Sequence, residues 1–187
     1  VSCVGIREEG NNRGEEVDAI VTDAGGKWAI DPDGGPPWCA YFRSSLVLEL
    51  RRRGWDAKGA VTSGRAVSHV LKADPETVLH REFIWDIPDP ERFIGAALVK
   101  VRGTSRKRDR DDVARDVAKV MSGDKTAGHI ATVVGFDLDE RLIHCVGGNS
   151  SGSGHSRVRG SGSVAYETYG PSLKSWGSVV ALVEIRT

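Results

Sequence analysis

The sequence predicts an α+β fold in which helices come first along the chain and an antiparallel sheet follows. Apolar residues recur at helical spacing in the first third of the chain, most clearly from Ala40 to about Arg53. Farther along, short apolar runs such as Ile130 to Phe136 alternate with turn residues, a pattern typical of strands. Helices and strands separated in this way favour the α+β class. With 187 residues and 39% hydrophobic content, we expect a single domain over residues 1–187.

The first part of the chain contains four stretches with helical patterns. Before the third of them, a loop rich in Gly, Pro and Asp runs from Gly25 to Pro37. The fourth has Ser63 as its expected N-cap. The four expected helices are Val4 to Glu9, Glu15 to Ala24, Ala40 to Arg53, and Gly64 to Ala73.

The second part predicts the strands of the sheet. A tight turn from Asp137 to Glu140 joins two of them into a hairpin. The Gly/Ser-rich stretch from Gly147 to Ser163 is expected to be a loop. A charged segment at 104–124, with an amphipathic helix from Asp111 to Met121, is expected to be an insertion between strands. The expected strands are Thr77 to Leu79, Glu82 to Ile87, Gly95 to Arg102, Ile130 to Phe136, Leu142 to Val146, Val164 to Tyr169, and Ser178 to Arg186.

The composition argues against several classes of partner. The 26 basic residues equal the 26 acidic residues, so no net charge favours nucleic acid or an anionic membrane. No apolar run reaches membrane-spanning length. The three cysteines form no CxxC pair and have no zinc-type spacing with histidines, so we expect no zinc site. Cys3 and Cys145 are expected to be structural.

Cys39 stands where a thiol can become a nucleophile. The turn Gly34-Gly35-Pro36-Pro37 runs through Trp38 into the long helix, so Cys39 lies at or just before a helix N-terminus. Helix N-termini carry partial positive charge and free N–H groups, which stabilise a thiolate and an adjacent oxyanion. The alternative is that Cys39 is a small buried apolar residue.

His129 and Asn149 could complete the chemistry that a cysteine nucleophile needs. Such an enzyme requires an imidazole that moves the proton and a polar group that orients the imidazole. His129 begins one strand of the expected hairpin, and Asn149 follows the other. Neighbouring strands lie about 5 Å apart, so the two residues are expected to be close to each other. His155 is a weaker alternative base, because a Gly/Ser-rich loop holds it poorly.

Four short motifs in order carry a resemblance to a known family. They are Glu9-Gly10-Asn11-Asn12-Arg13-Gly14 with Val17-Asp18, Pro37-Trp38-Cys39-Ala40 with Phe42, Gly128-His129-Ile130 with Val133, and Gly148-Asn149. With these motifs the sequence resembles the papain-like cell-wall hydrolases of the CHAP and NlpC-like superfamily. The resemblance extends from about Val4 to the C-terminus, with the segment at 104–124 as additional material.

The resemblance implies a papain-like fold, peptidoglycan as the partner and substrate, and hydrolysis of its amide bonds without metal or cofactor. It also implies action at the bacterial cell wall, after secretion or delivery by a phage. By position, Cys39 is the nucleophile, His129 the general base and acid, and Asn149 the orienting residue. The backbone N–H of Cys39 is one oxyanion donor. Trp38 and Tyr41 are expected to border the substrate.

Several departures from the family pattern leave the substrate open. Gly147 stands where an acidic residue is common, Arg43 where an apolar residue is usual, and Ala131 where glycine is frequent. Two alternatives therefore stand beside the hydrolase. One is a non-catalytic domain that binds cell-wall peptide or forms part of a phage structure. The other is a deamidase or acyltransferase on the same scaffold.

Overall fold

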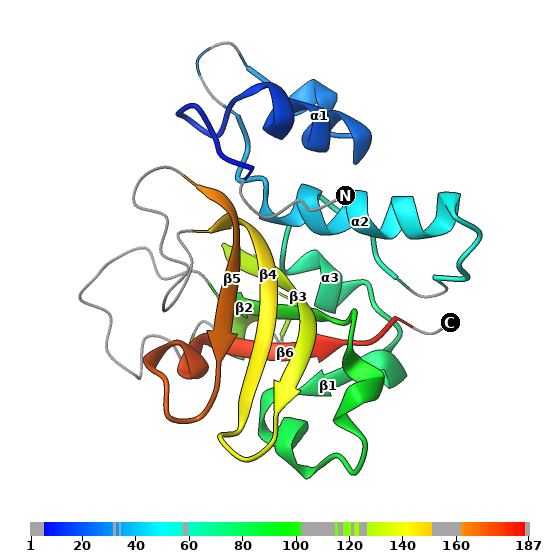
Figure 1. The fold of residues 1–187 in the computed structure, drawn as a ribbon, viewed down its shortest axis with the longest axis vertical. Coiled ribbons are helices and arrows are strands. Elements are labelled where there is room, and N and C mark those ends of the chain that lie inside the picture. Colours follow the sequence, from blue (N-terminus) through cyan, green and yellow to red (C-terminus); the bar gives the residue numbers. More distant parts are fainter. Residues whose placement is uncertain are drawn as a thin grey trace.

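The protein has an α+β fold built on a six-stranded antiparallel sheet (Figure 1). A computed structural model describes residues 6–31, 33, 35–57, 60–101, 115, 118–120, 122–123, 127–150 and 162–185. The α+β class predicted from the sequence is confirmed. The expected insertion at 104–124 and its helix from Asp111 to Met121 lie mostly outside these residues, although Arg115 and residues 118–120 are helical.

The strands follow the order β1-β6-β2-β3-β4-β5 across the sheet, and each adjacent pair is antiparallel. β3 and β4 form the expected hairpin. β6, the last strand along the chain, lies between β1 and β2, whereas β5 is at an edge. The strands are β1 (Val78–His80), β2 (Ala97–Val101), β3 (Gly128–Asp137), β4 (Leu142–Ser150), β5 (Ser163–Tyr169) and β6 (Val179–Val183).

Two of the expected helices are confirmed nearly to the residue. α1 (Glu15–Asp23) buries Val17 and Val21, which lie on one face at helical spacing. α2 (Cys39–Arg52) begins directly after the proline-rich turn, packs against α1 on one side and contacts β3 and β4 on the other (Figure 1). The shorter helical elements are α3 (Ser68–Leu71), η1 (Lys27–Ala29), η2 (Pro75–Thr77), η3 (Arg81–Asp86), η4 (Pro90–Phe93) and η6 (Lys174–Ser178).

The expected helix from Val4 to Glu9 is wrong over the residues that the structure describes. Arg7 forms a β-bridge with Ser163 at the start of β5. Backbone hydrogen bonds join Glu8 N–H to the Gly162 carbonyl and Val164 N–H to the Ile6 carbonyl, both at 2.8–2.9 Å. A segment this short is too small to nucleate a stable helix, and an open sheet edge offers its backbone ready partners.

Three further expectations are corrected by local chemistry. Glu82 to Ile87 is not a strand, because η3 covers most of it and two nearby prolines cannot donate to a sheet. The helix expected over Gly64 to Ala73 shortens to α3, and Ser63 Oγ accepts the N–H of Arg65 in a tight turn instead of capping a helix. β4 continues to Ser150, so the expected loop begins later than predicted.

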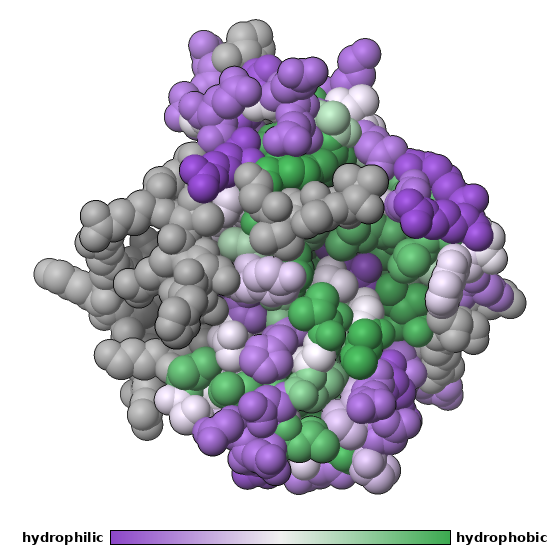
Figure 2. Space-filling view, in the orientation of Figure 1, coloured by the Kyte–Doolittle hydropathy of each residue, from purple (hydrophilic) through white to green (hydrophobic). Residues whose placement is uncertain are grey.

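The apolar core fills both sides of the sheet. α2 and α3 cover a cluster that includes Val67, Val99 and Ile130, while Ile84, Phe93 and other residues pack on the opposite face. Figure 2 shows hydrophilic residues over the α1 end of the molecule and apolar residues gathered over part of the sheet below it. Among the helices of the described residues, none has the length and apolar character needed to cross a membrane.

Tyr41 occupies space that two glycines leave open beside α2. A Cβ atom added at Gly26 would lie 2.2 Å from Cε1 of Tyr41, and one added at Gly64 would lie 2.4 Å from its Cζ. The tyrosine is buried. The loops before and after α2 therefore both close on the first turn of this helix.

We expect Gly64→Ala to lower the free energy of unfolding by about 1–3 kcal/mol, because the new methyl group would overlap the Tyr41 ring. Urea unfolding would measure the change. Tyr41→Leu in the same background should cost less than it does in the wild type, since it removes the overlap. Gly177→Ala is the control, because no atom lies within 4 Å of the added Cβ. Equal losses of unfolding free energy in Gly64→Ala and Gly177→Ala would contradict this packing.

Candidate active site

Cys39 is the first residue of α2 and is almost fully buried, with 2% of its surface exposed. Trp38 is the N-cap residue, and its side chain makes no capping hydrogen bond. The N–H groups at the start of α2 therefore lack a side-chain cap beside the thiol. This position can stabilise negative charge on sulfur or on an adjacent oxygen.

His129 is the second residue of β3, which packs under α2, and it is also buried. Its side chain makes a hydrogen bond with the side chain of Cys39. Its Nε2 lies 2.8 Å from Oε1 of Glu167. Since Nε2 is engaged by the carboxylate, Nδ1 is the ring nitrogen left for Cys39. The imidazole thus lies between a thiol and a carboxylate.

Glu167, on β5, is the site residue that sequence reasoning missed. Only 5% of its surface is exposed. Its Oε2 accepts a hydrogen bond from the hydroxyl of Tyr169, and the Ser150 side chain also bonds to the carboxylate. No motif marks this glutamate. The available signal was the alternation of side chains along β5. It places Glu167 on the same buried face as Ala165 and Tyr169, and a buried acid among such residues needs a polar partner.

The His129–Glu167 pair is an ion pair at neutral pH. Burial alone would lower the pKa of His129, but the Glu167 charge and the hydrogen bonds to Cys39 and Glu167 raise it to about 9. Burial likewise opposes ionisation of Glu167, yet the positive charge of His129 and its hydrogen bond lower the pKa of Glu167 to about 2. The imidazolium therefore persists beside the thiol in the physiological range.

Gly147 provides the space in which this pair forms. It lies on β4, paired with Ala165 of β5. A Cβ atom at this position would lie 2.6 Å from Oε1 of Glu167 and 3.2 Å from Nε2 of His129. Any larger residue would therefore disturb the hydrogen bond between them. The neighbouring strand β5 thus places the carboxylate of Glu167 beside this glycine.

Asn149 lies near the end of β4 with a left-handed backbone (φ 55°). Its Nδ2 donates to Oδ1 of Asn12 at 2.9 Å. The structure thus joins Asn149 to the N-terminal loop, while Glu167 bonds the Nε2 atom of His129. The expectation that Asn149 orients the imidazole stays a prediction.

Trp38 and Tyr41 are both buried. Trp38 packs edge-to-face on Phe42, with ring centroids 6.5 Å apart, and its Nε1 lies 3.4 Å from Oε2 of Glu8. In the structure these two aromatic side chains are core residues next to Cys39, and their contact with substrate stays a prediction.

Cys145 is fully buried, and burial raises its pKa well above the ordinary value, as expected for a structural thiol.

Within the described ranges, no group of three or more His, Cys, Asp or Glu side chains is arranged to hold a metal ion.

Comparisons with protein-family models, with curated proteins and with solved structures found no match to this chain. The geometry around Cys39 and His129 therefore carries the functional argument.

The pair makes stability depend on pH in both directions. The pKa of His129 rises on folding from 6.5 to about 9, so its contribution is complete below pH 6.5 and is lost towards pH 9. The pKa of Glu167 falls from 4.5 to about 2, so its contribution is complete above pH 4.5 and is lost in acid. Both contributions to stability are therefore complete between pH 4.5 and 6.5.

We expect the difference in unfolding free energy between wild type and Glu167→Gln to be largest between pH 4.5 and 6.5. It should shrink by roughly 2–3 kcal/mol above pH 9, because the histidine then loses its charge. Urea titrations across pH would measure it. Glu140→Gln, at an exposed turn, is the control and should show no such dependence. A difference that stays constant with pH would refute the ion pair.

We expect Gly147→Ala to lower the pKa of His129, because the added methyl group separates the imidazole from the carboxylate. Titration of the imidazole resonances by NMR would measure the shift. Glu167→Asp in this background should recover part of it, since the shorter side chain relieves the overlap. Gly135→Ala on β3, with open space around its Cβ, should leave the pKa unchanged. A His129 pKa in Gly147→Ala equal to that of the wild type would contradict the geometry.

Proposed function

We propose that this protein is a papain-like cysteine hydrolase that cleaves amide bonds of bacterial peptidoglycan. The observation that carries the proposal is the buried His129 imidazole, which lies between the Cys39 thiol at a helix N-terminus and the Glu167 carboxylate. A nucleophile, a base and an orienting group in that order are the parts that thiol-dependent acyl transfer requires. Peptidoglycan as the substrate class comes from the sequence resemblance.

In the proposed reaction, Cys39 reacts as a thiolate paired with the protonated His129. The sulfur attacks the amide carbonyl, and the oxyanion lies near the backbone N–H groups at the start of α2. The C–N bond then breaks as His129 gives its proton to the leaving amine. Water then attacks the resulting thioester and gives its proton to neutral His129. Collapse of the intermediate releases the acid and the Cys39 thiolate, which restores the thiolate–imidazolium pair.

We assign the orienting role to Glu167, whose carboxylate fixes Nε2–H and stabilises the imidazolium. The negative charge of Cys39 also helps to hold the His129 proton. Acylation removes that charge, so the imidazole can lose its proton more easily in the acyl-enzyme than in the free enzyme. The same group can therefore act as an acid in the first half of the reaction and as a base in the second.

The first test is digestion of purified peptidoglycan, with mass spectrometry of the products. We expect wild type to release fragments whose new termini name the bond, and Cys39→Ala to release none. Glu167→Gln should be slower by about 10²- to 10⁴-fold, because the imidazole loses its orienting partner. Glu140→Gln should match wild type. If the wild type releases no fragments from peptidoglycan of several chemotypes, the peptidoglycan assignment is refuted.

A second readout separates the chemistry from the substrate. Cys39 should react with iodoacetamide near neutral pH much faster than Cys145, because the His129 imidazolium lies beside Cys39. Glu167→Gln should shift the pH dependence of that reaction. Fast alkylation without wall digestion, but with ammonia release from a protein substrate, would favour the deamidase alternative. Slow alkylation of Cys39 would favour a non-catalytic binding domain.

A further inference from the structure

We propose that Asn12 and Asn149 form a positioning clamp that fixes the turn before Cys39, and that Asn149 acts on this turn and not on the imidazole. The clamp comprises the side-chain amides of Asn12 and Asn149 and the backbone of Gly35. Its effect on catalysis rests on the proposed function, whereas its effect on the turn does not.

A continuous chain of hydrogen bonds connects β4 to the turn. Asn149 Nδ2 donates to Oδ1 of Asn12 at 2.9 Å, and Asn12 Nδ2 donates to the carbonyl of Gly35 at 3.1 Å. The N–H of Gly35 donates in turn to the carbonyl of Asn11 at 2.8 Å. Both backbone polar groups of Gly35 are therefore held by the same loop, four residues before the candidate nucleophile.

The contact between the loop and the turn is close. A Cβ atom at Gly35 would lie 2.3 Å from the backbone oxygen of Asn12. Pro36 and Pro37 follow, and proline fixes one of the two free backbone dihedrals of each residue. A displacement of Gly35 is therefore passed along a stiff segment to the start of α2.

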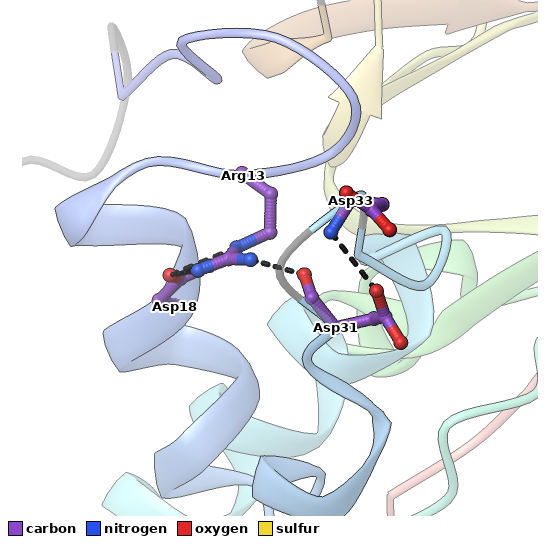
Figure 3. A network of polar contacts seen from close by, with 4 residues as sticks. All are labelled: Arg13, Asp18, Asp31 and Asp33. Carbon is purple, nitrogen blue, oxygen red and sulfur yellow. Dashed lines mark hydrogen bonds and ion pairs between the residues drawn. The ribbon is translucent and has the colours of Figure 1, made fainter.

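Arg13 anchors the other side of the loop (Figure 3). Its Nε and Nη2 bond the carboxylate of Asp18 on α1 at 2.8–3.0 Å, and its Nη1 donates to the backbone carbonyl of Asp31. The Asp31 side chain accepts the N–H of Asp33 at 2.9 Å. The loop is thus held to α1 and to the segment that precedes the turn.

Three asparagines around this junction adopt left-handed backbone conformations. Asn11, Asn12 and Asn149 have φ angles of 50°, 57° and 55°. Few residues other than glycine and asparagine accept this region readily. At Gly162 a Cβ atom would lie 2.3 Å from Oδ1 of Asn149, so the residue that precedes β5 also leaves room for this amide. The surrounding backbone is therefore shaped to hold these side chains in place.

The clamp joins the two halves of the candidate site. Cys39 belongs to the helical half, whereas His129 lies on the sheet next to β4, the strand that carries Asn149. A shift of about 1 Å between reacting groups can cost about 100-fold in rate. Tying the turn to the end of β4 therefore maintains the distance between thiol and imidazole. The Nε2 atom of His129 is directed at Glu167, so orientation of the ring does not require Asn149.

The test replaces each of the three left-handed asparagines with glycine. Glycine accepts the same backbone conformation, so Asn12→Gly, Asn149→Gly and the control Asn11→Gly differ mainly in the amide that is lost. Amide exchange of Gly35 and Trp38 reports on the turn, because the two prolines between them carry no N–H. The pH dependence of Cys39 alkylation reports on the imidazole. Wall digestion reports on catalysis.

We expect Asn12→Gly and Asn149→Gly to speed exchange in the turn and to slow wall digestion by about 10- to 100-fold. The pH midpoint of alkylation should stay at the wild-type value in both, and the double variant should be no worse than either single variant, since both break one chain of bonds. Asn11→Gly should behave like wild type in every assay.

Two outcomes would overturn the inference. Asn149→Gly could shift the alkylation profile as Glu167→Gln does, with Asn12→Gly unchanged, in which case Asn149 acts on the imidazole. Alternatively, exchange in the turn could be unchanged in both variants. If wild type digests no peptidoglycan, the proposed substrate fails, yet exchange and alkylation still decide whether the clamp exists.

Discussion

The arrangement around the candidate site depends on one buried ion pair, between His129 of β3 and Glu167 of β5. Removing two charges from water is costly, and mutual attraction offsets this cost only when every polar atom has a partner. Here the carboxylate also bonds Tyr169 and Ser150, while the imidazole also meets Cys39. The pair lies across β4, because its two members come from the strands on either side of it. The position of β5 therefore determines the charge state of a group on β3.

This geometry explains why β4 has glycine where the pair crosses it. A side chain at residue 147 would occupy the space that the hydrogen bond needs. A glycine in a strand normally weakens the sheet, since it packs nothing and is flexible when unfolded. At this position the cost is offset by the contact that the empty space permits. The glycine and the glutamate are diagonal neighbours on adjacent strands and depend on each other.

Much of the fold could be predicted because local patterns agree with tertiary structure. The long helix after Cys39 and the hairpin of β3 and β4 have strong periodicity and clear turn residues. The predictions of a helix at Ile6 to Glu9 and of a strand at the η3 segment were wrong. Backbone partners at the sheet edge and nearby prolines outweighed weak local preferences. Cys39 and His129 could be found from chain order and a helix N-terminus. The alternation of β5 could mark Glu167 as a buried acid, but it could not show that His129 is its partner, because that contact arises from a strand pairing that no single segment encodes.

The position of β6 has a consequence for synthesis of the protein. This strand comes last along the described chain, yet it is not at an edge of the sheet, because it lies between β1 and β2. A ribosome-bound chain that has emerged only as far as β5 can pair β2 with β3, β4 and β5, but it cannot join β1 to them. The sheet beneath α2 is completed only when the final strand inserts. Acquisition of the finished sheet is thereby tied to synthesis of β6, and a chain that stops before this strand exposes two unpaired edges to quality control.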